Sequence, residues 1–268
     1  MDKKIGFIGS GNMAKAILGG LLSSGVAASE NIMASALTDA TIESIKKEFN
    51  INTTRDNISV AAVSDYLFLA VKPDQYAGVI NEMKDHLKEN TIVITIAAGV
   101  TLESLGEQLG QGVKIVRTMP NTPSLVGEGM SALCPNEKVT EEEMAQVVEL
   151  FSSFGEAEVL PESLMDSVPA VSGSSPAYVF MFIEALADGA VKQGISRDKA
   201  YKMAAQAVLG AAKMVLETGS HPGELKDAVC SPGGATIEAV STLEKTGFRA
   251  SVLSAMESCY KKSSKMID

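Results

Sequence analysis

The sequence predicts an α/β domain with a parallel sheet, followed by an all-α domain. Short apolar runs alternate with amphipathic stretches from Lys4 to about Leu160, a pattern typical of strands that alternate with helices. After Pro161 the strand signal disappears and helical patterns continue. A chain of 268 residues, 46% of them hydrophobic, is long enough for two domains. We therefore expect domains 1–160 and 161–268.

The predicted strands are continuously apolar runs with several β-branched residues, as expected of parallel strands buried on both faces. They are KIGFIG, NIMAS, DYLFLAV, TIVITIAA, VKIVRTM and GMSALC. Amphipathic stretches between the runs predict helices, and the alternation predicts βαβ units. These stretches are NMAKAILGGLLSSG, ATIESIKKEF, QYAGVINEMKDHL and TLESLGEQLG.

The remaining helices are predicted by caps and apolar periodicity. Thr140 is the expected N-cap of TEEEMAQVVELFSSFG, and Glu143 completes a capping box. Pro176 to Gly194 is apolar nearly all round in its first turns, which indicates a helix buried on most sides, in a domain core or a subunit interface. Two more helices are expected at Ser196 to Thr218, capped by Ser196, and at Gly247 to Ile267.

Charge and cysteine content argue against several classes of protein. A formal net charge of −10 disfavours nucleic-acid and anionic-membrane partners. Cys134, Cys230 and Cys259 are odd in number and too far apart for a disulfide framework or a metal site. No secretion signal is visible, and no apolar run approaches the roughly 20 residues of a membrane span. We expect a soluble, cytoplasmic protein without a bound metal.

A glycine-rich turn links the first predicted strand to the first helix in IGFIGSGNMA. Gly9, Gly11 and Ala14 fit the pattern G-x-G-x-x-G/A. Gly9 would permit the tight turn, Gly11 would let a pyrophosphate approach the helix N-terminus, and Ala14 would allow close packing. Because the pattern follows a strand and opens a helix, it predicts a Rossmann-type dinucleotide-binding domain, with a plain glycine turn as the alternative.

The end of the second predicted strand favours NADP over NAD. Residues 33–38 read MASALT and hold no carboxylate for a ribose 2′-hydroxyl, and Asp39 comes several residues late. Small hydroxyl residues such as Ser35 leave room for a 2′-phosphate. No arginine stands ready to pair with it, although Lys46 or Lys47 could reach back. NADH stays open as a second cofactor.

Two more segments follow strands at the ligand-binding edge of an open α/β sheet. The AVKP segment offers Lys72, which can be catalytic, can hold cofactor or can be a solvated surface lysine. In ITIAAGV, small residues would leave space beside a flat nicotinamide ring, with simple tight packing as the alternative.

The chain lacks an obvious group for proton transfer. His86 lies on the polar part of a helix pattern, and His221 lies in the turn GSHPGEL. No Ser-His-Asp set or metal cluster can be assembled. A C=N substrate fits that absence, because a protonated imine is already electrophilic at carbon and needs mainly positioning.

A second glycine-rich turn, CSPGGATIEAV, starts at Cys230 and enters a helix near Ala235. Glycines at a helix start expose backbone N–H groups to an anion. A plain connection between two helices is the alternative reading.

Several motifs together resemble the pyrroline-5-carboxylate reductases over essentially the whole chain. They are FIGSGNMA, AVKP, MPNTP, VSGSSPAYVFMFIEALADGAV and MVLETGSHPGELKDAVCSPGGATIEAV. The resemblance implies NAD(P)H-dependent reduction of the cyclic imine 1-pyrroline-5-carboxylate to L-proline, the last step of proline synthesis. It also implies that the C-terminal domain is a dimerisation domain, in a homodimer and in a decamer built from dimers.

The resemblance also implies the site residues, position by position. The implied cofactor-binding residues are Ile8, Gly9, Ser10, Gly11, Asn12, Met13, Ser35, Asn57, Ala70, Val71, Lys72, Pro73, Ala97 and Ala98. The implied substrate-binding residues are Ser231, Gly233, Gly234, Ala235 and Thr236. Thr236 is the implied catalytic residue, whose hydroxyl would hydrogen-bond the imine nitrogen. The exposed N–H groups of the turn would bind the substrate carboxylate.

Departures from the family pattern keep other functions open. The second strand's end lacks an arginine often found there, and Ala228 stands where some members have an asparagine that touches cofactor. The alternatives are a related hydroxyacid dehydrogenase or imine reductase, and a non-catalytic NADP-binding sensor. The predicted helix Pro176 to Gly194 has no lysine in its first turns, which counts against the dehydrogenase. The intact second glycine-rich turn counts against the sensor.

Overall fold

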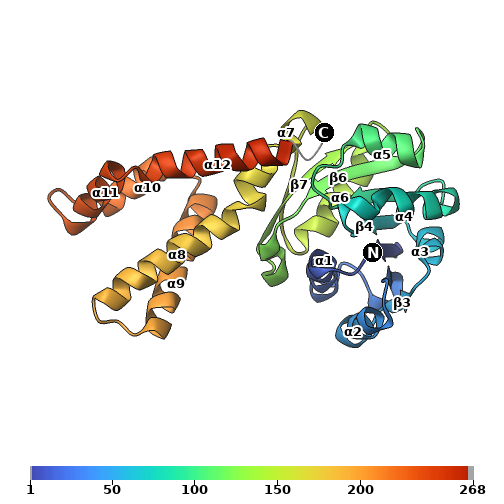
Figure 1. The fold of residues 1–268 in the computed structure, drawn as a ribbon, viewed down its shortest axis with the longest axis horizontal. Helices are drawn as coiled ribbons and strands as arrows, with labels where there is room; N and C mark the ends of the chain where they lie inside the picture. Colours follow the sequence, from blue (N-terminus) through green and yellow to red (C-terminus); the bar gives the residue numbers. More distant parts are fainter. Residues whose placement is uncertain (1, 265–268) are drawn as a thin grey trace. The chain divides into compact units, whose positions relative to one another are not determined.

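A computed structural model describes residues 2–264, and these fold into two compact units. Among the described residues, the sheet unit comprises 2–174 and 259–264, and the helical unit comprises Ser175–Ser258 (Figure 1). The chain leaves and re-enters the sheet unit at neighbouring points, since Cys259 Sγ donates to Ser174 Oγ at 3.3 Å. The domain boundary near residue 160 stays a prediction.

An eight-stranded sheet in the order β3-β2-β1-β4-β5-β6-β7-β8 forms the centre of the sheet unit. The strands are β1 (Ile5–Ile8), β2 (Ile32–Ser35), β3 (Asn52–Thr54), β4 (Tyr66–Leu69), β5 (Ile92–Thr95), β6 (Lys114–Met119), β7 (Gly129–Pro135) and β8 (Gly155–Val159). All predicted apolar runs are strands. β3 and β8 were not predicted, because the three-residue β3 is polar and β8 is mostly exposed.

The sheet is parallel except between β6 and β7, which pair antiparallel with Val116 opposite Pro135. The expectation of a wholly parallel sheet is therefore wrong at this pair. The connection 120–128 holds only the short 3-10 helix η4 (Thr122–Val126), whereas a parallel return needs a longer crossover.

Helices cover both faces of the sheet (Figure 1). One core lies under α1, α2 and α6, and a second lies under α3, α4 and α5. These helices are α1 (Asn12–Ser23), α2 (Asp39–Phe49), α3 (Asn57–Val63), α4 (Tyr76–Met83), α5 (Leu102–Leu109) and α6 (Glu141–Ser152). Shorter elements are η1 (Ser29–Asn31), η2 (Pro73–Gln75), η3 (Lys84–His86), α7 (Glu162–Met165) and the π-helix η5 (Pro169–Gly173). The capping box of Thr140 and Glu143 is confirmed at the start of α6.

The helical unit is built from long helices with few buried side chains. The helices are α8 (Ser175–Lys192), α9 (Arg197–Thr218), α10 (Pro222–Val229), α11 (Ala235–Lys245) and α12 (Phe248–Ser264), of which α12 also supplies the last described part of the sheet unit. The predicted end of this last helix at Ile267 lies outside the described residues. Ser196 precedes α9 as predicted, but its side chain makes no capping hydrogen bond.

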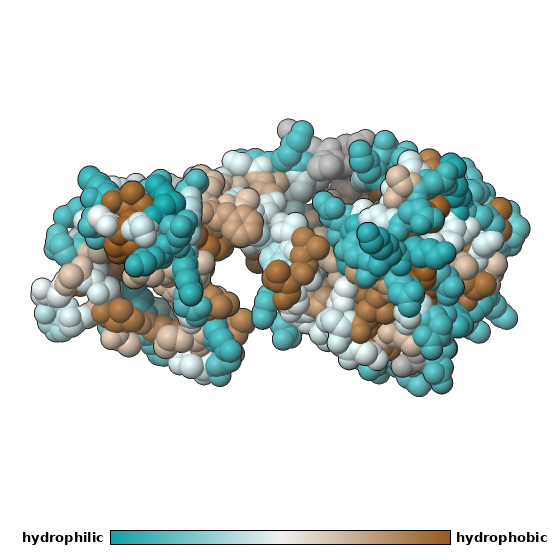
Figure 2. All heavy atoms as spheres, turned by 90° about the horizontal axis from the view of Figure 1, so that it is seen from below, coloured by the Kyte–Doolittle hydropathy of each residue, from teal (hydrophilic) through white to brown (hydrophobic). Residues whose placement is uncertain are grey.

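Large apolar side chains lie at the surface of the helical unit (Figure 2). On α8 only Ala187 is buried, while Met181 is 70% exposed. The expectation that α8 is buried in a domain core is therefore wrong, and a subunit interface is the reading that remains.

The helical stretch Glu162–Lys192 is long and apolar enough to cross a membrane by length and composition. The sequence was expected to contain no such stretch. Charged residues such as Glu184 and Asp188 interrupt the apolar run, but the mean hydropathy of the stretch stays high enough for a membrane span. One such stretch is weak evidence for a membrane span, because core helices of soluble proteins can have the same length and composition.

Candidate cofactor and substrate site

The first glycine turn has the geometry of a phosphate cradle. Gly9 adopts φ +96°, and a Cβ there would lie 2.5 Å from the Ala70 carbonyl oxygen, so only glycine fits. Gly11 is the N-cap of α1, no side chain caps this end, and a Cβ on Gly11 would meet nothing within 4 Å. The N-terminus of α1 thus faces open space, which fits a dinucleotide pyrophosphate.

A groove of about 860 Å³ extends from this turn along the carboxyl ends of β1, β2 and β4. This is the edge at which open α/β sheets bind ligands. It brings together most of the predicted cofactor residues, namely Ile8, Gly9, Ser10, Gly11, Ser35, Asn57, Ala70, Val71 and Lys72.

A chain of hydrogen bonds fixes one wall of the groove. Ser10 Oγ donates to the Ser35 carbonyl at 3.0 Å, and Ser35 Oγ donates to Asn57 Oδ1 at 2.7 Å. Asn57 Nδ2 then donates to Glu82 Oε2 at 2.8 Å. The wall is therefore held in place by contacts within the chain.

The other predicted cofactor residues do not line the groove. Asn12 lines a separate depression on α1, Met13 packs against the core, and Pro73 is the exposed first residue of η2. Ala97 and Ala98 line a cavity of about 10 Å³ at the end of β5.

Two expectations about basic residues are wrong. Lys46 and Lys47 line a different depression, on α2, and do not reach the groove. An arginine is present after all, because Arg55 lines the groove. Arg55 was missed because it lies about 20 residues beyond the end of β2 and follows β3, a strand that no apolar run marks.

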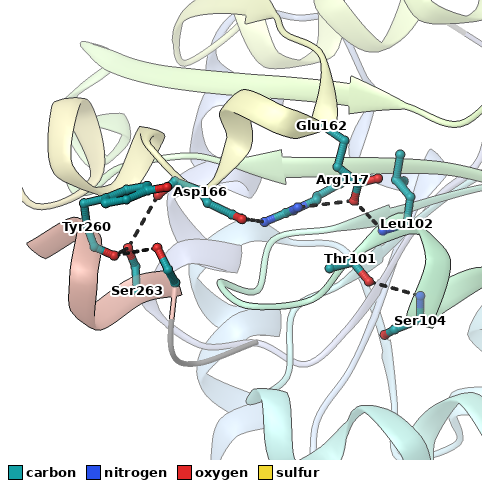
Figure 3. Close-up of polar contacts among 9 residues, drawn as sticks. Thr101, Leu102, Ser104, Arg117, Glu162, Asp166, Tyr260 and Ser263 are labelled. Atoms are coloured by element: carbon teal, nitrogen blue, oxygen red, sulfur yellow. Dashed lines mark hydrogen bonds and ion pairs between the residues drawn. The ribbon is translucent and has the colours of Figure 1, made fainter. Parts of the chain in front are cut away.

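A buried arginine lines the same small cavity as Ala97 and Ala98 and forms an ion-pair network (Figure 3). Arg117, whose side chain is 6% exposed, forms ion pairs with Glu162 at 3.2 Å and Asp166 at 2.7 Å. Glu162 also accepts from the Leu102 backbone N–H at 2.7 Å. The network ties the first residue of α5 and the strand β6, which holds Arg117, to α7. The arginine inside the apolar run VKIVRTM was the sequence signal for this network.

Tyr76 and the two histidines occupy structural or surface positions. Tyr76 donates its hydroxyl to the Leu69 carbonyl at 2.7 Å, and burial raises its pKa to about 12, so the phenol stays protonated. His86 is exposed, and His221 caps α10 by accepting from the Gly223 N–H at 3.0 Å, as its turn position predicted. Within residues 2–264, no group of three or more His, Cys, Asp or Glu side chains could hold a metal ion.

The second glycine turn lies in the helical unit and precedes α11. The Gly234 N–H donates to the Ser231 carbonyl at 3.0 Å, and Gly233 adopts φ +68°. Proline followed by a glycine with positive φ is the signature of a type II turn. Gly234 is the N-cap of α11, again without a capping side chain, and Thr236 follows in the first turn. The predicted substrate residues thus gather at one open helix N-terminus.

Comparisons with known proteins agree with both halves of the chain. Residues 162–266 match the family model for pyrroline-5-carboxylate reductase dimerisation, and residues 4–99 match the model for coenzyme F420-dependent NADP oxidoreductases. The pyrroline-5-carboxylate reductase of Escherichia coli is 53% identical over 266 residues, 99% of both chains.

Solved structures extend the match to the fold. The pyrroline-5-carboxylate reductase of Coxiella burnetii is 34% identical, with a TM-score of 0.94 over 100% of both chains. The pyrroline carboxylate reductase of Plasmodium falciparum, solved with NADP bound, is 35% identical, with a TM-score of 0.89 over 100% of this chain and 99% of that one. The chain therefore belongs to the pyrroline-5-carboxylate reductase family.

Proposed function

We propose that this chain reduces the C=N bond of 1-pyrroline-5-carboxylate to give L-proline, with NADPH preferred over NADH. The observation that carries the proposal is the 53% identity to the Escherichia coli reductase over 99% of both chains. The two open helix N-termini, one per unit, supply the two anion sites that this reaction needs.

The groove of the sheet unit is the proposed cofactor site. The positive end of α1 and the turn from Gly9 to Gly11 would hold the pyrophosphate in a chain whose net charge is −10. Ser35 and Asn57 would face the adenosine end, and Ala97 and Ala98 the nicotinamide end. When bound, the reduced nicotinamide supplies the hydride.

The turn before α11 is the proposed substrate site. Its open N–H groups and helix dipole would bind the carboxylate, with a further donor from Ser231. Thr236 would hydrogen-bond the imine nitrogen and orient it. No hydrogen bond to another described residue occupies the Thr236 hydroxyl, so it is free for this role.

We also propose a homodimer formed through the helical unit, and a decamer built from dimers. The match of residues 162–266 to a dimerisation model supports self-association, as do the exposed apolar side chains of the helical unit. Residues 161–268 would form this domain. Cover by a second subunit would account for the apolar stretch Glu162–Lys192 without a membrane. We place the protein in the cytoplasm, without nucleic-acid partners, in line with its acidic charge.

Mixing the protein with NADPH and 1-pyrroline-5-carboxylate tests the activity directly. Loss of reduced-cofactor absorbance together with the appearance of proline is the expected result, and it should be faster than with NADH. NADPH binding without turnover would instead identify a sensor. Turnover of a 2-hydroxy acid with NADP⁺, but not of the imine, would identify a dehydrogenase.

A further inference from the structure

We propose that Arg55 recognises the 2′-phosphate of NADPH and sets the preference over NADH. The inference rests on the proposed cofactor site. In an NAD-binding domain of this type, a carboxylate after the second strand binds the ribose 2′-hydroxyl, and a nearby arginine accommodates the 2′-phosphate in NADP-binding ones. Residues 36–38 hold no carboxylate, and Arg55 lines the groove beside them.

The pairing of β2 with β3 places Arg55 at this position. The two strands are parallel, with Ser35 opposite Thr54, and the Ala36 N–H donates to the Thr54 carbonyl at 3.3 Å. Arg55, the residue that follows β3, therefore lies beside the loop that follows β2. An arginine that is remote in sequence from β2 thus lies beside the end of β2.

Local contacts fix the backbone and the side chain of Arg55. The backbone enters α3 through Asp56, whose N–H donates to Thr54 Oγ1 at 3.1 Å and whose carboxylate caps the Ile58 N–H at 3.0 Å. Arg55 Nη2 donates to the Leu37 carbonyl at 3.0 Å. The guanidinium is thereby held at the groove and keeps other N–H donors for a ligand.

The remaining contact of Arg55 is one that a phosphate can replace. Arg55 Nη1 lies 3.4 Å from Asp39 Oδ1, and the two side chains are 61% and 80% exposed. Such exposed pairs contribute little, whereas a guanidinium binds phosphate with two parallel hydrogen bonds. Thr41 lines the same part of the groove and offers a hydroxyl.

Two carboxylates border this end of the groove and would repel a phosphate. Glu82 already accepts from Asn57, and Asp39 pairs with Arg55. The positive charge of Arg55 is therefore needed to offset this repulsion when a 2′-phosphate binds. A ribose 2′-hydroxyl is uncharged and does not require the arginine. Removal of the Asp39 charge should consequently favour NADPH.

Binding measured without substrate tests the inference. Arg55→Ala should weaken NADPH binding about 10- to 30-fold and change NADH binding less than about twofold, because only NADPH loses a charge-assisted contact. Arg55→Lys should restore part of the affinity, and Asp39→Asn should raise the affinity for NADPH alone. Dissociation constants from calorimetry or cofactor fluorescence give these values.

Adenosine 2′,5′-bisphosphate and 5′-AMP isolate the contact from the rest of the cofactor. Arg55→Ala should weaken the first and leave the second unchanged. Lys47→Ala is the matched control, because it removes an equal charge from a different depression of the same surface. Thermal unfolding checks that each variant is folded.

Equal effects on NADPH and NADH, no effect on either, or the same loss in Lys47→Ala would overturn the role of Arg55. A wild-type protein that prefers NADH would overturn it as well. A wild-type protein that binds neither cofactor would overturn the proposed cofactor site too, so the two failures are distinguishable.

Discussion

The two units of the chain differ in where their large apolar side chains lie. In the sheet unit, side chains such as Phe7, Phe68 and Phe151 are fully buried between sheet and helices. In the helical unit, the buried apolar residues among those described are alanines, while Leu216 is 79% exposed. Each unit nevertheless contains a helix whose N-cap is a glycine and whose N-terminus has no side-chain capping hydrogen bond. The same helix N-terminus thus forms in a unit with a large buried core and in a unit without one. The exposed apolar side chains of the helical unit agree with its match to a dimerisation model.

A negative charge at the first turn should produce the largest effect on the sheet unit. Gly11→Asp places a carboxylate where the pyrophosphate would lie, and repulsion at about 4 Å costs roughly 4 kcal/mol. NADPH affinity should fall about 1000-fold, as measured by cofactor fluorescence. Gly106→Asp, at another glycine with open space around it, is the control. Unchanged affinity in Gly11→Asp would show that the cofactor binds elsewhere.

A charge on the exposed face of α8 tests whether the helical unit is covered by a second copy. Met181→Glu should weaken self-association by about 2–3 kcal/mol, because a large apolar contact is replaced by a charge without a partner. Sedimentation velocity across a dilution series measures this. Val63→Glu alters an exposed apolar residue of the sheet unit and should leave the assembly intact. Identical assembly of Met181→Glu and wild type would place the interface on another surface.

A substitution in the second glycine turn should lower turnover and leave cofactor binding unchanged. Thr236→Ala removes the hydroxyl proposed to hold the imine nitrogen, and kcat should fall about 30-fold with the loss of one such hydrogen bond. NADPH affinity should stay near that of the wild type, since the first turn is intact. In the control Thr242→Ala, the lost hydroxyl donates only to the Glu238 carbonyl of the same helix. Normal kcat in Thr236→Ala would remove its catalytic role.

The smallest effect concerns the stability of the sheet unit in acid. Burial raises the pKa of Glu143, but hydrogen bonds from Lys114 and the Thr140 N–H outweigh it, and the net pKa lies below the ordinary 4.5. A lowered pKa stabilises the fold above the unfolded-state value, and this stability is lost as the pH falls through the folded-state value.

Glu143→Gln should therefore reduce the free energy of unfolding by less than about 1 kcal/mol at pH 7 and show less acid sensitivity than the wild type. Denaturant titrations from pH 7 to about pH 3 measure this. Glu141→Gln, at an exposed position of the same helix turn, should follow the wild type. A larger acid sensitivity in Glu143→Gln than in the wild type would contradict the assigned pKa direction.

Local patterns predicted much of the fold and part of the candidate site. Buried apolar runs such as DYLFLAV correctly predicted strands, and the spacing of Gly9 and Gly11 predicted the turn that lines the groove. β3 was invisible because a three-residue polar edge strand has no apolar signal. Arg55 was missed with it, since only the register of β3 brings it beside β2. The partners of Arg117 are the first residue of α7 and the residue that follows α7, so tertiary packing alone reveals that network.

The hydrogen bond between Ser174 and Cys259 has a consequence for engineering. The chain leaves the sheet unit after Ser174 and returns at Cys259, and their side chains are 3.3 Å apart. The whole helical unit is therefore, in topological terms, an insert between two adjacent anchor points. A short linker across these points would delete residues 175–258 while preserving every strand of the sheet. The groove proposed to bind the cofactor could then be altered in a chain that lacks the helical unit.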